Sequence, residues 1–236
     1  MARNLILTGG IFHPFDESAP ALARLLALYG IESTITEDIE DGLARLAAGG
    51  FELLTIYALR WRMLDNEKYQ PHRARWGMSL SQAGRDAITA HVDSGRGLLG
   101  IHTAAICFDD WPGWGKLLGG AWCWGRSGHP PLGTASVRID DAAHPITRAL
   151  PDFTTIDEVY GGLDLEPDVQ PLMHATTGGE AGWQPMLWAR EVGRGRVAFD
   201  ALGHDAAALT HNTHRRILAR AALWTLGRRD LEVASA

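Results

Sequence analysis

The sequence is poor in cysteine and has neither a long apolar run nor an excess of basic residues. Its 236 residues include two cysteines, Cys107 and Cys123, so no disulfide framework is implied. No segment approaches the roughly 20 apolar residues of a membrane span. The apolar run after Asn4 is also too short for a signal peptide. We therefore expect a cytoplasmic protein with no membrane contact.

The charge balance and the missing motifs exclude several classes of function. Lysine and arginine total 22 against 28 acidic residues, a net charge of −6. Without a concentrated basic stripe, a nucleic-acid partner is not expected. The chain has no P-loop, no Gly-x-Ser-x-Gly elbow and no His-Glu-x-x-His motif, and Gly9-Gly10 lacks the third glycine of a dinucleotide fingerprint.

Apolar segments that alternate between strand and helix patterns predict an α/β fold in one domain, residues 1–236. Hydrophobic residues make up 46% of the chain, enough for a substantial core. Short connections between strands and helices favour right-handed crossovers and a mostly parallel sheet covered on both faces. Residues 58–78 are expected to form an irregular segment before the next helix. The helix after His102 is expected to reach Phe108. The tail after Gly227 is expected to be loose. Expected strands cover 4–8, 31–36, 51–57, 97–101 and 196–202, and expected helices 18–29, 38–48, 79–93 and 212–226.

Residues 121–195 differ from the rest in their glycines, prolines and brief β-type runs. We expect a loop-rich lobe over the sheet's carboxyl edge, with antiparallel pairs. Its predicted strands are 133–139, 153–160, 170–175 and 186–190.

Histidines follow three of the predicted parallel strands. His13, His102 and His204 come after the first, the central and the last strand, at the edge where open α/β sheets bind ligands. Converging imidazoles with a carboxylate can ligate a divalent ion or supply a general acid and base. The alternative is that His102 only caps its turn.

Asp157-Glu158-Val159-Tyr160 supplies candidate carboxylates. Alternation along a strand places Glu158 and Tyr160 on one face and Asp157 on the other. An exposed strand edge is the alternative use of this acidic pair. Asp205 either orients the adjacent His204 or caps the next segment.

Nine tryptophans among 236 residues is a high content, and several lie near glycine and histidine in the middle of the chain. Their faces suit sugar rings, but tryptophan also fills cores and interfaces, which we expect for most of them. A homodimer through this Trp-rich middle is compatible with the sequence. Cys107 is expected to pack inside a helix, and Cys123 to lie in a loop with no histidine at fixed reach.

As a set, these motifs resemble the trehalose-utilisation ThuA-like family. The resemblance covers nearly the whole chain and is carried by Gly100-Ile101-His102-Thr103-Ala104, Gly119-Gly120 with His129-Pro130, His144-Pro145-Ile146-Thr147, Asp157-Glu158-Val159-Tyr160, Trp188-Ala189-Arg190-Glu191 and Gly203-His204-Asp205.

The resemblance implies a flavodoxin-like three-layer sandwich of the class I glutamine amidotransferase-like type, with an irregular β-containing insertion. Amidotransferases of this superfamily carry a cysteine at the elbow that His102 occupies here. Glutamine hydrolysis by a thiolate is therefore not expected.

The family is linked to sugar catabolism beside dehydrogenases that make 3-keto sugars. The resemblance implies a pocket for a sugar, a 3-keto glycoside or a disaccharide, and a sugar dehydrogenase as pathway partner. We assign acid–base roles to His102, Glu158 and His204, and substrate contacts to His13, Trp124, Tyr160, Asp205 and His211. A divalent metal such as zinc or manganese would be held by His102, His129 and His204.

Two other functions compete with this enzyme. One is a sugar-binding or regulatory protein that performs no reaction. The other is a hydrolase with an unrecognised nucleophile, for which Cys123 is the candidate.

Overall fold

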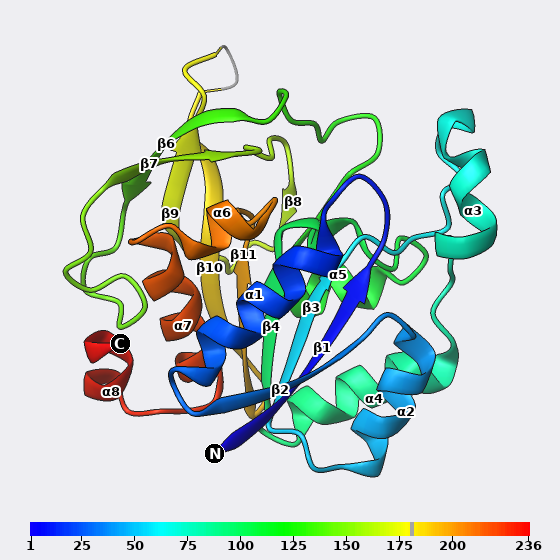
Figure 1. Ribbon diagram of the computed structural model, residues 1–236, viewed down its shortest axis with the longest axis horizontal. Helices are drawn as coiled ribbons and strands as arrows, with labels where there is room; N and C mark the ends of the chain where they lie inside the picture. Colours follow the sequence, from blue (N-terminus) through cyan, green and yellow to red (C-terminus); the bar gives the residue numbers. More distant parts are fainter. Residues whose placement is uncertain (180–181) are drawn as a thin grey trace.

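A single nine-stranded sheet with helices on both faces forms the centre of the molecule (Figure 1). The computed structural model describes residues 1–179 and 182–236, so Glu180 and Ala181, inside the predicted lobe 121–195, lie outside the described residues. The sheet contains β1 (Ala2–Gly9), β2 (Ile31–Thr36), β3 (Leu53–Ala58), β4 (Gly97–Ile101), β6 (Gly133–Ile139), β7 (Phe153–Asp157), β9 (Pro171–Thr176), β10 (Gln184–Val192) and β11 (Gly195–Asp200).

The strands run in the order β2-β1-β3-β4-β11-β10-β9-β6-β7. From β2 to β11 every neighbouring pair is parallel, and from β11 to β7 every pair is antiparallel. Strands β3 and β4 are buried along their whole length, as the unbroken apolar runs predicted for inner parallel strands.

The strands predicted within residues 121–195 form antiparallel pairs and continue the main sheet. Strand β10 pairs with β11, from Leu187 opposite Asp200 to Val192 opposite Gly195. Strands β9, β6 and β7 then follow in that order towards the edge of the sheet. Alternating residues predicted the strands but could not show which neighbour they would pair with. A second, two-stranded sheet joins β5 (Gly120–Ala121) and β8 (Asp164–Leu165).

Eight α-helices and two 3-10 helices are present in the described residues. Helices α1 and α7 pack on one face of the sheet, and α2 and α4 pack together on the other. The α-helices are α1 (Phe15–Ala27), α2 (Ile39–Ala48), α3 (Gln70–Trp76), α4 (Gln82–Asp93), α5 (Pro112–Leu118), α6 (Ala206–Thr210), α7 (His214–Thr225) and α8 (Asp230–Ser235), and the 3-10 helices are η1 (Glu67–Tyr69) and η2 (His102–Ile106). None of them is long and apolar enough to cross a membrane.

Three predicted boundaries are corrected by the structure. Helix α1 begins at Phe15, so Ser18 is buried inside it and donates to the Pro14 carbonyl instead of capping the helix. The expected helix after His102 is a 3-10 helix that ends at Ile106. The strand predicted for 153–160 ends at Asp157.

The tail after Gly227 is ordered as α8. Arg220 of α7 is buried, and its guanidinium donates to the carbonyls of Ala234 and Ala236. Val233 is also fully buried. These contacts hold a segment whose polar sequence predicted a loose end.

Candidate active site

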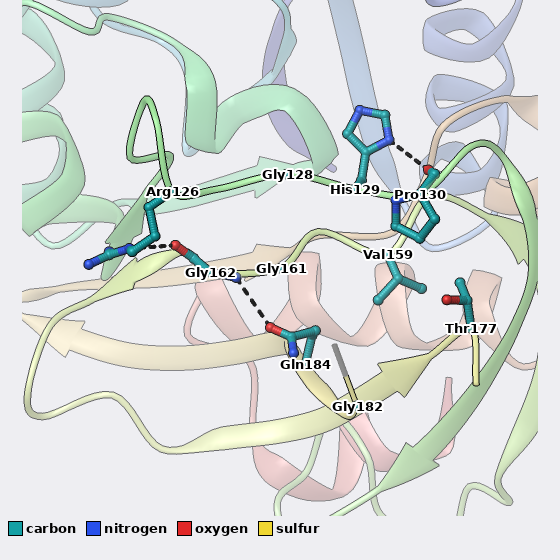
Figure 2. Close-up of a pocket in the computed structure, with 10 residues that line it drawn as sticks. All are labelled: Arg126, Gly128, His129, Pro130, Val159, Gly161, Gly162, Thr177, Gly182 and Gln184. Carbon is teal, nitrogen blue, oxygen red and sulfur yellow. Dashed lines mark hydrogen bonds between the residues drawn. The ribbon is translucent and has the colours of Figure 1, made fainter. Parts of the chain in front are cut away.

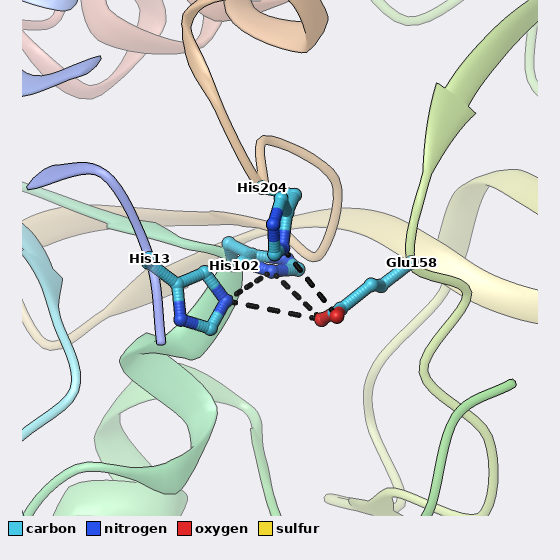
Figure 3. A group of neighbouring side chains, drawn as sticks. All are labelled: His13, His102, Glu158 and His204. Carbon is cyan, nitrogen blue, oxygen red and sulfur yellow. Dashed lines mark hydrogen bonds and ion pairs between the residues drawn. The ribbon is translucent and has the colours of Figure 1, made fainter. Parts of the chain in front are cut away.

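Four side chains from distant parts of the chain converge at one edge of the sheet (Figure 3). His13 lies in the loop between β1 and α1, and His102 directly follows β4. His204 lies in the loop after β11, and Glu158 is the first residue after β7. The parallel strands end here, so the predicted convergence of His13, His102 and His204 is seen in the structure.

The polar atoms of this cluster are within ion-pair range of one another. Glu158 Oε2 lies 3.4 Å from His102 Nε2 and 3.8 Å from His13 Nε2. Glu158 Oε1 lies 3.4 Å from His204 Nδ1. One ligand atom from each of the four residues falls within 4.8 Å of all the others, a spacing at which one metal ion could be held.

The cluster is largely shielded from water. The side chain of His102 is 0% exposed, and those of His13, Glu158 and His204 are 6%, 10% and 14% exposed. His102 is therefore the innermost of the four, and His204 is the most exposed.

Burial and mutual contact shift the ionisation of these groups. Burial raises the pKa of Glu158, but the three neighbouring imidazoles outweigh it and hold that pKa well below its usual range. Burial lowers the pKa of His13, whereas the Glu158 carboxylate raises that of His204. At neutral pH the carboxylate is ionised and the His13 ring is neutral.

Asp157 holds the two loops that carry Glu158 and His204. Its buried carboxylate accepts from Gly203 N at 2.8 Å and His204 N at 3.2 Å, and also from Glu158 N at 2.8 Å. Tyr57 donates to the Gly203 carbonyl at 2.6 Å on the same loop. Asp157 thus points away from the cluster while Glu158 enters it, as the alternation predicted.

A cavity of about 310 Å³ with aromatic walls lies against the cluster. Among the residues predicted to contact substrate, His13, Trp124 and Tyr160 line it. Glu158 and His129, which were predicted for acid–base chemistry and metal binding, line it as well. The other lining residues carried no specific signal in the sequence and are Phe12, Leu59, Trp61, Lys68, Tyr69, Ile106 and Trp122.

The tryptophans divide between cavity and core. Trp61 and Trp124 stack at the cavity with ring centroids 5.9 Å apart. Trp114 and Trp188 are fully buried, the structural role expected for most of the nine.

His129 lies between this cavity and a second one of about 360 Å³ (Figure 2). Its Nδ1 is 2.9 Å from the Pro130 carbonyl and 3.6 Å from Glu158 Oε1, and its side chain is 35% exposed. Because a carbonyl only accepts, Nδ1 carries the hydrogen and the neutral ring keeps a lone pair on Nε2. His129 therefore lies beside the cluster. His129 was predicted as a metal ligand, but the ligand atom that joins those of His102 and His204 comes from His13.

The structure places two other predicted residues, Asp205 and His211, away from this site. Asp205 caps α6 by accepting from Ala208 N, the second of the two roles expected for it. His211 stacks on Phe153, with centroids 5.0 Å apart, and lines a different cavity together with Asp205. Neither residue belongs to the aromatic cavity, because α6 turns this segment away from it.

Neither cysteine lines the aromatic cavity or the second cavity. Cys107 is fully buried, which raises the pKa of its thiol to about 12. Cys123 lies 4.0 Å from the Trp124 carbonyl, and it lines neither the aromatic cavity nor the second one.

Comparison with known families decides the assignment of the chain. The family model described as ThuA, trehalose utilisation, matches residues 4–225. The chain belongs to the ThuA family. No curated protein matches it.

Solved structures share the fold of this ThuA-family chain at low sequence identity. A ThuA-like protein from Parabacteroides merdae is 18% identical with a TM-score of 0.75, covering 96% of this chain and 91% of that one. A cytoplasmic protein from Salmonella typhimurium LT2 is 14% identical with a TM-score of 0.64, covering 94% and 99%. A cold-adapted β-galactosidase from Rahnella sp. R3 is 13% identical with a TM-score of 0.62, covering 97% of this chain but 32% of the enzyme.

Proposed function

We propose that this ThuA-family protein is a cytoplasmic enzyme that acts on a sugar or 3-keto glycoside by acid–base chemistry. The observation that carries the proposal is the aromatic cavity whose wall includes Glu158 and His129. Indole and phenol faces stack on the apolar faces of sugar rings, while the carboxylate and imidazole can exchange protons with the ring substituents. The flavodoxin-like architecture implied by the resemblance is part of this proposal, and the parallel strand order β2-β1-β3-β4-β11 supports it.

A 3-keto group makes elimination accessible to such a site. The carbonyl acidifies the proton on C2, and a base removes this proton. The electron pair of the C–H bond is then delocalised onto the keto oxygen as an enolate. The pair then forms the C1–C2 double bond as the C1–O glycosidic bond breaks, and the leaving oxygen takes a proton. The products are a 3-keto glycal and an alcohol or second sugar, and no oxidant or water is consumed.

His129 is the proposed base for the C2 proton. Its unprotonated Nε2 is the accessible lone pair of a ring that Pro130 holds by the other nitrogen. Glu158, ionised at neutral pH, stabilises the imidazolium that forms. His102 and His204 do not line the cavity. They contact the Glu158 carboxylate and keep it ionised and positioned.

The test uses p-nitrophenyl 3-keto glucosides of both anomers. We expect nitrophenol release by the wild type and exchange of the C2 proton in D₂O, followed by NMR. His129→Ala and His102→Ala should each lower both rates by about 100-fold or more, the usual contribution of a positioned acid or base. His174→Gln, on β9 away from the cavity, is the control and should keep the wild-type rates.

Absence of both release and C2 exchange in the wild type would refute the enzyme. If the glucosides then quenched tryptophan fluorescence in a saturable way, the sugar-binding alternative would replace it, because the cavity carries Trp61, Trp122 and Trp124. Retained turnover after alkylation of Cys123 would dispose of the cysteine hydrolase. The sugar dehydrogenase partner and the homodimer stay predictions.

A further inference from the structure

The hydrogen-bond partners of His13 and His102 fix which nitrogen of each ring carries a hydrogen. His102 Nδ1 lies 2.7 Å from the Ala201 carbonyl, and His13 Nδ1 lies 3.1 Å from the Ile11 carbonyl. A carbonyl oxygen can only accept, so both Nδ1 atoms are protonated. In the neutral rings both Nε2 atoms then expose lone pairs, and these two atoms are 3.1 Å apart.

Two further ligand atoms face the same place. Glu158 Oε2 and His204 Nδ1 are buried atoms that have no hydrogen-bond partner within the described residues. In the part of the chain that the structure describes, the nearby hydroxyl is that of Tyr160, 3.1 Å from His102 Nε2, and its single hydrogen cannot serve the three acceptors His13 Nε2, His102 Nε2 and Glu158 Oε2. Buried acceptors that face one another without donors are costly, and a cation among them removes that cost.

The spacing matches a small metal ion. Ligands at about 2.0 to 2.1 Å from zinc in tetrahedral geometry are separated by roughly 3.3 Å. The closest polar contacts within the cluster are 3.1, 3.4, 3.4 and 3.8 Å. Hydrogen bonds from the outer ring nitrogens to backbone carbonyls are also the usual support of ligating histidines.

We propose that His13, His102, His204 and Glu158 bind one divalent transition-metal ion, with zinc preferred. Three imidazoles and one carboxylate favour zinc over the magnesium and calcium that all-oxygen sites select, and manganese would bind more weakly. His129 is not among the four residues whose ligand atoms converge. The ring nitrogen that it brings within 3.6 Å of Glu158 is Nδ1, whose hydrogen faces the Pro130 carbonyl.

The position of the site assigns a role to the ion. His13 and Glu158 line the aromatic cavity, so a ligand there approaches the ion from that side. A bound ion would polarise a keto oxygen and favour ligands with adjacent oxygen atoms. This role rests on the proposed function, whereas binding of the ion does not.

The test is metal binding measured without any substrate. Purified protein is stripped with a chelator, loaded with zinc or manganese, dialysed, and analysed by elemental mass spectrometry, with affinity from competition against a chromophoric chelator. We expect one zinc per chain and weaker manganese binding. Glu158→Gln and His13→Gln should weaken zinc binding by at least about 100-fold, the upper end of losses caused by outer-shell changes alone.

Two control variants make the result specific. His129→Ala and His174→Gln should each keep one zinc at wild-type affinity, and circular dichroism of the stripped proteins shows whether every variant is folded. Zinc absent from the wild type, or bound equally by Glu158→Gln and His13→Gln, would overturn the site. Because His129→Ala should lose turnover but keep zinc, the metal site and the proposed reaction can fail independently.

Discussion

His102 adopts a backbone conformation that non-glycine residues seldom occupy. Its φ is 50°, at the junction between β4 and η2. Thr103 donates to the Ala58 carbonyl at 2.7 Å, and the His102 ring contacts the Ala201 carbonyl, so the turn is held from two neighbouring strands. Strain of this kind persists where the surroundings over-determine it, commonly at functional sites.

Gly10 holds the loop that carries His13, and its replacement is our first prediction at the residue scale. A Cβ built there would lie 2.6 Å from the Leu59 carbonyl oxygen, and the φ of 149° is unfavourable for an L side chain. We expect Gly10→Ala to lower the free energy of unfolding by about 2 to 3 kcal/mol, measured by urea denaturation.

Gly30 provides the matched control for this substitution. Its φ is 73°, but no atom lies within 4 Å of an added Cβ. Gly30→Ala should therefore show the backbone cost alone, about 1 kcal/mol. Equal losses in the two variants would mean that the contact with Leu59 does not constrain the loop.

Single residues were predictable where strand ends fixed their position. His13, His102 and His204 each follow a recognisable apolar strand, so their convergence could be expected from the sequence. The tautomers that turn lone pairs inward could not, because they depend on carbonyls of Ile11 and Ala201 that only the folded chain supplies. His211 comes directly before the last predicted helix, 212–226, and the unexpected helix α6 directs it elsewhere.

At the scale of elements, Asp157 joins the end of β7 to the loop after β11. Replacing it by asparagine removes the charge and introduces an amide that cannot accept at both oxygen positions. We expect Asp157→Asn to lower the free energy of unfolding by about 3 kcal/mol, since three backbone N–H groups lose part of a charge-assisted acceptor. Asp168→Asn, at an exposed ion pair with Arg190, should change it by less than about 1 kcal/mol.

A substitution that loosens the loops carrying Glu158 and His204 should also disturb the geometry of the four-residue cluster. Glu158 and His204 flank the Asp157 carboxylate, so Asp157→Asn should weaken zinc binding as well as stability. A variant as stable as Asp168→Asn would show that Asp157 does not bridge the two loops.

The elements of the parallel half were largely predictable, and those beyond β11 were not. Strands β1, β3 and β4 are largely buried and appear as apolar runs between turn residues. Strands β6 and β7 alternate in burial, which indicates a strand with one covered face but not its partner in the sheet. Helix α8 is short and polar, and the carbonyls that Arg220 engages give no signal in the sequence.

At the scale of the molecule, the site lies where the two kinds of pairing meet. His102 and His204 follow the parallel strands β4 and β11, whereas Glu158 follows β7 at the antiparallel end. The chain therefore completes the cluster only when both halves of the sheet have formed. This explains why the carboxylate was the least predictable member of the set.

Two buried histidines with opposite shifts should shape the stability of the whole molecule against pH. Burial lowers the pKa of His91 to about 4, despite the hydrogen bond to the Gly97 carbonyl. Burial would also lower the pKa of His214, but the buried Asp200 carboxylate at 2.9 Å outweighs it and raises that pKa to about 9.

The pKa values of His91 and His214 lie on opposite sides of the ordinary histidine pKa of about 6.5. Below it the unfolded chain protonates His91 before the folded chain does, so stability falls as the pH drops from about 6.5 towards about 4. Above it the folded chain retains the His214 proton that the unfolded chain loses, so this contribution disappears as the pH rises through about 9. Each limb amounts to about 3 kcal/mol, and together they predict a maximum near neutrality.

Urea denaturation between pH 4.5 and 9 should resolve the two limbs separately. His91→Gln removes the group responsible for the acid limb and should flatten the profile below about pH 6.5 while leaving the alkaline side sloping. His214→Gln should do the reverse, and it should also lower stability at pH 6 because Asp200 is left buried without its charged partner. A wild-type profile that is flat across this range, or a variant that alters the opposite limb, would contradict the assignment of these two histidines.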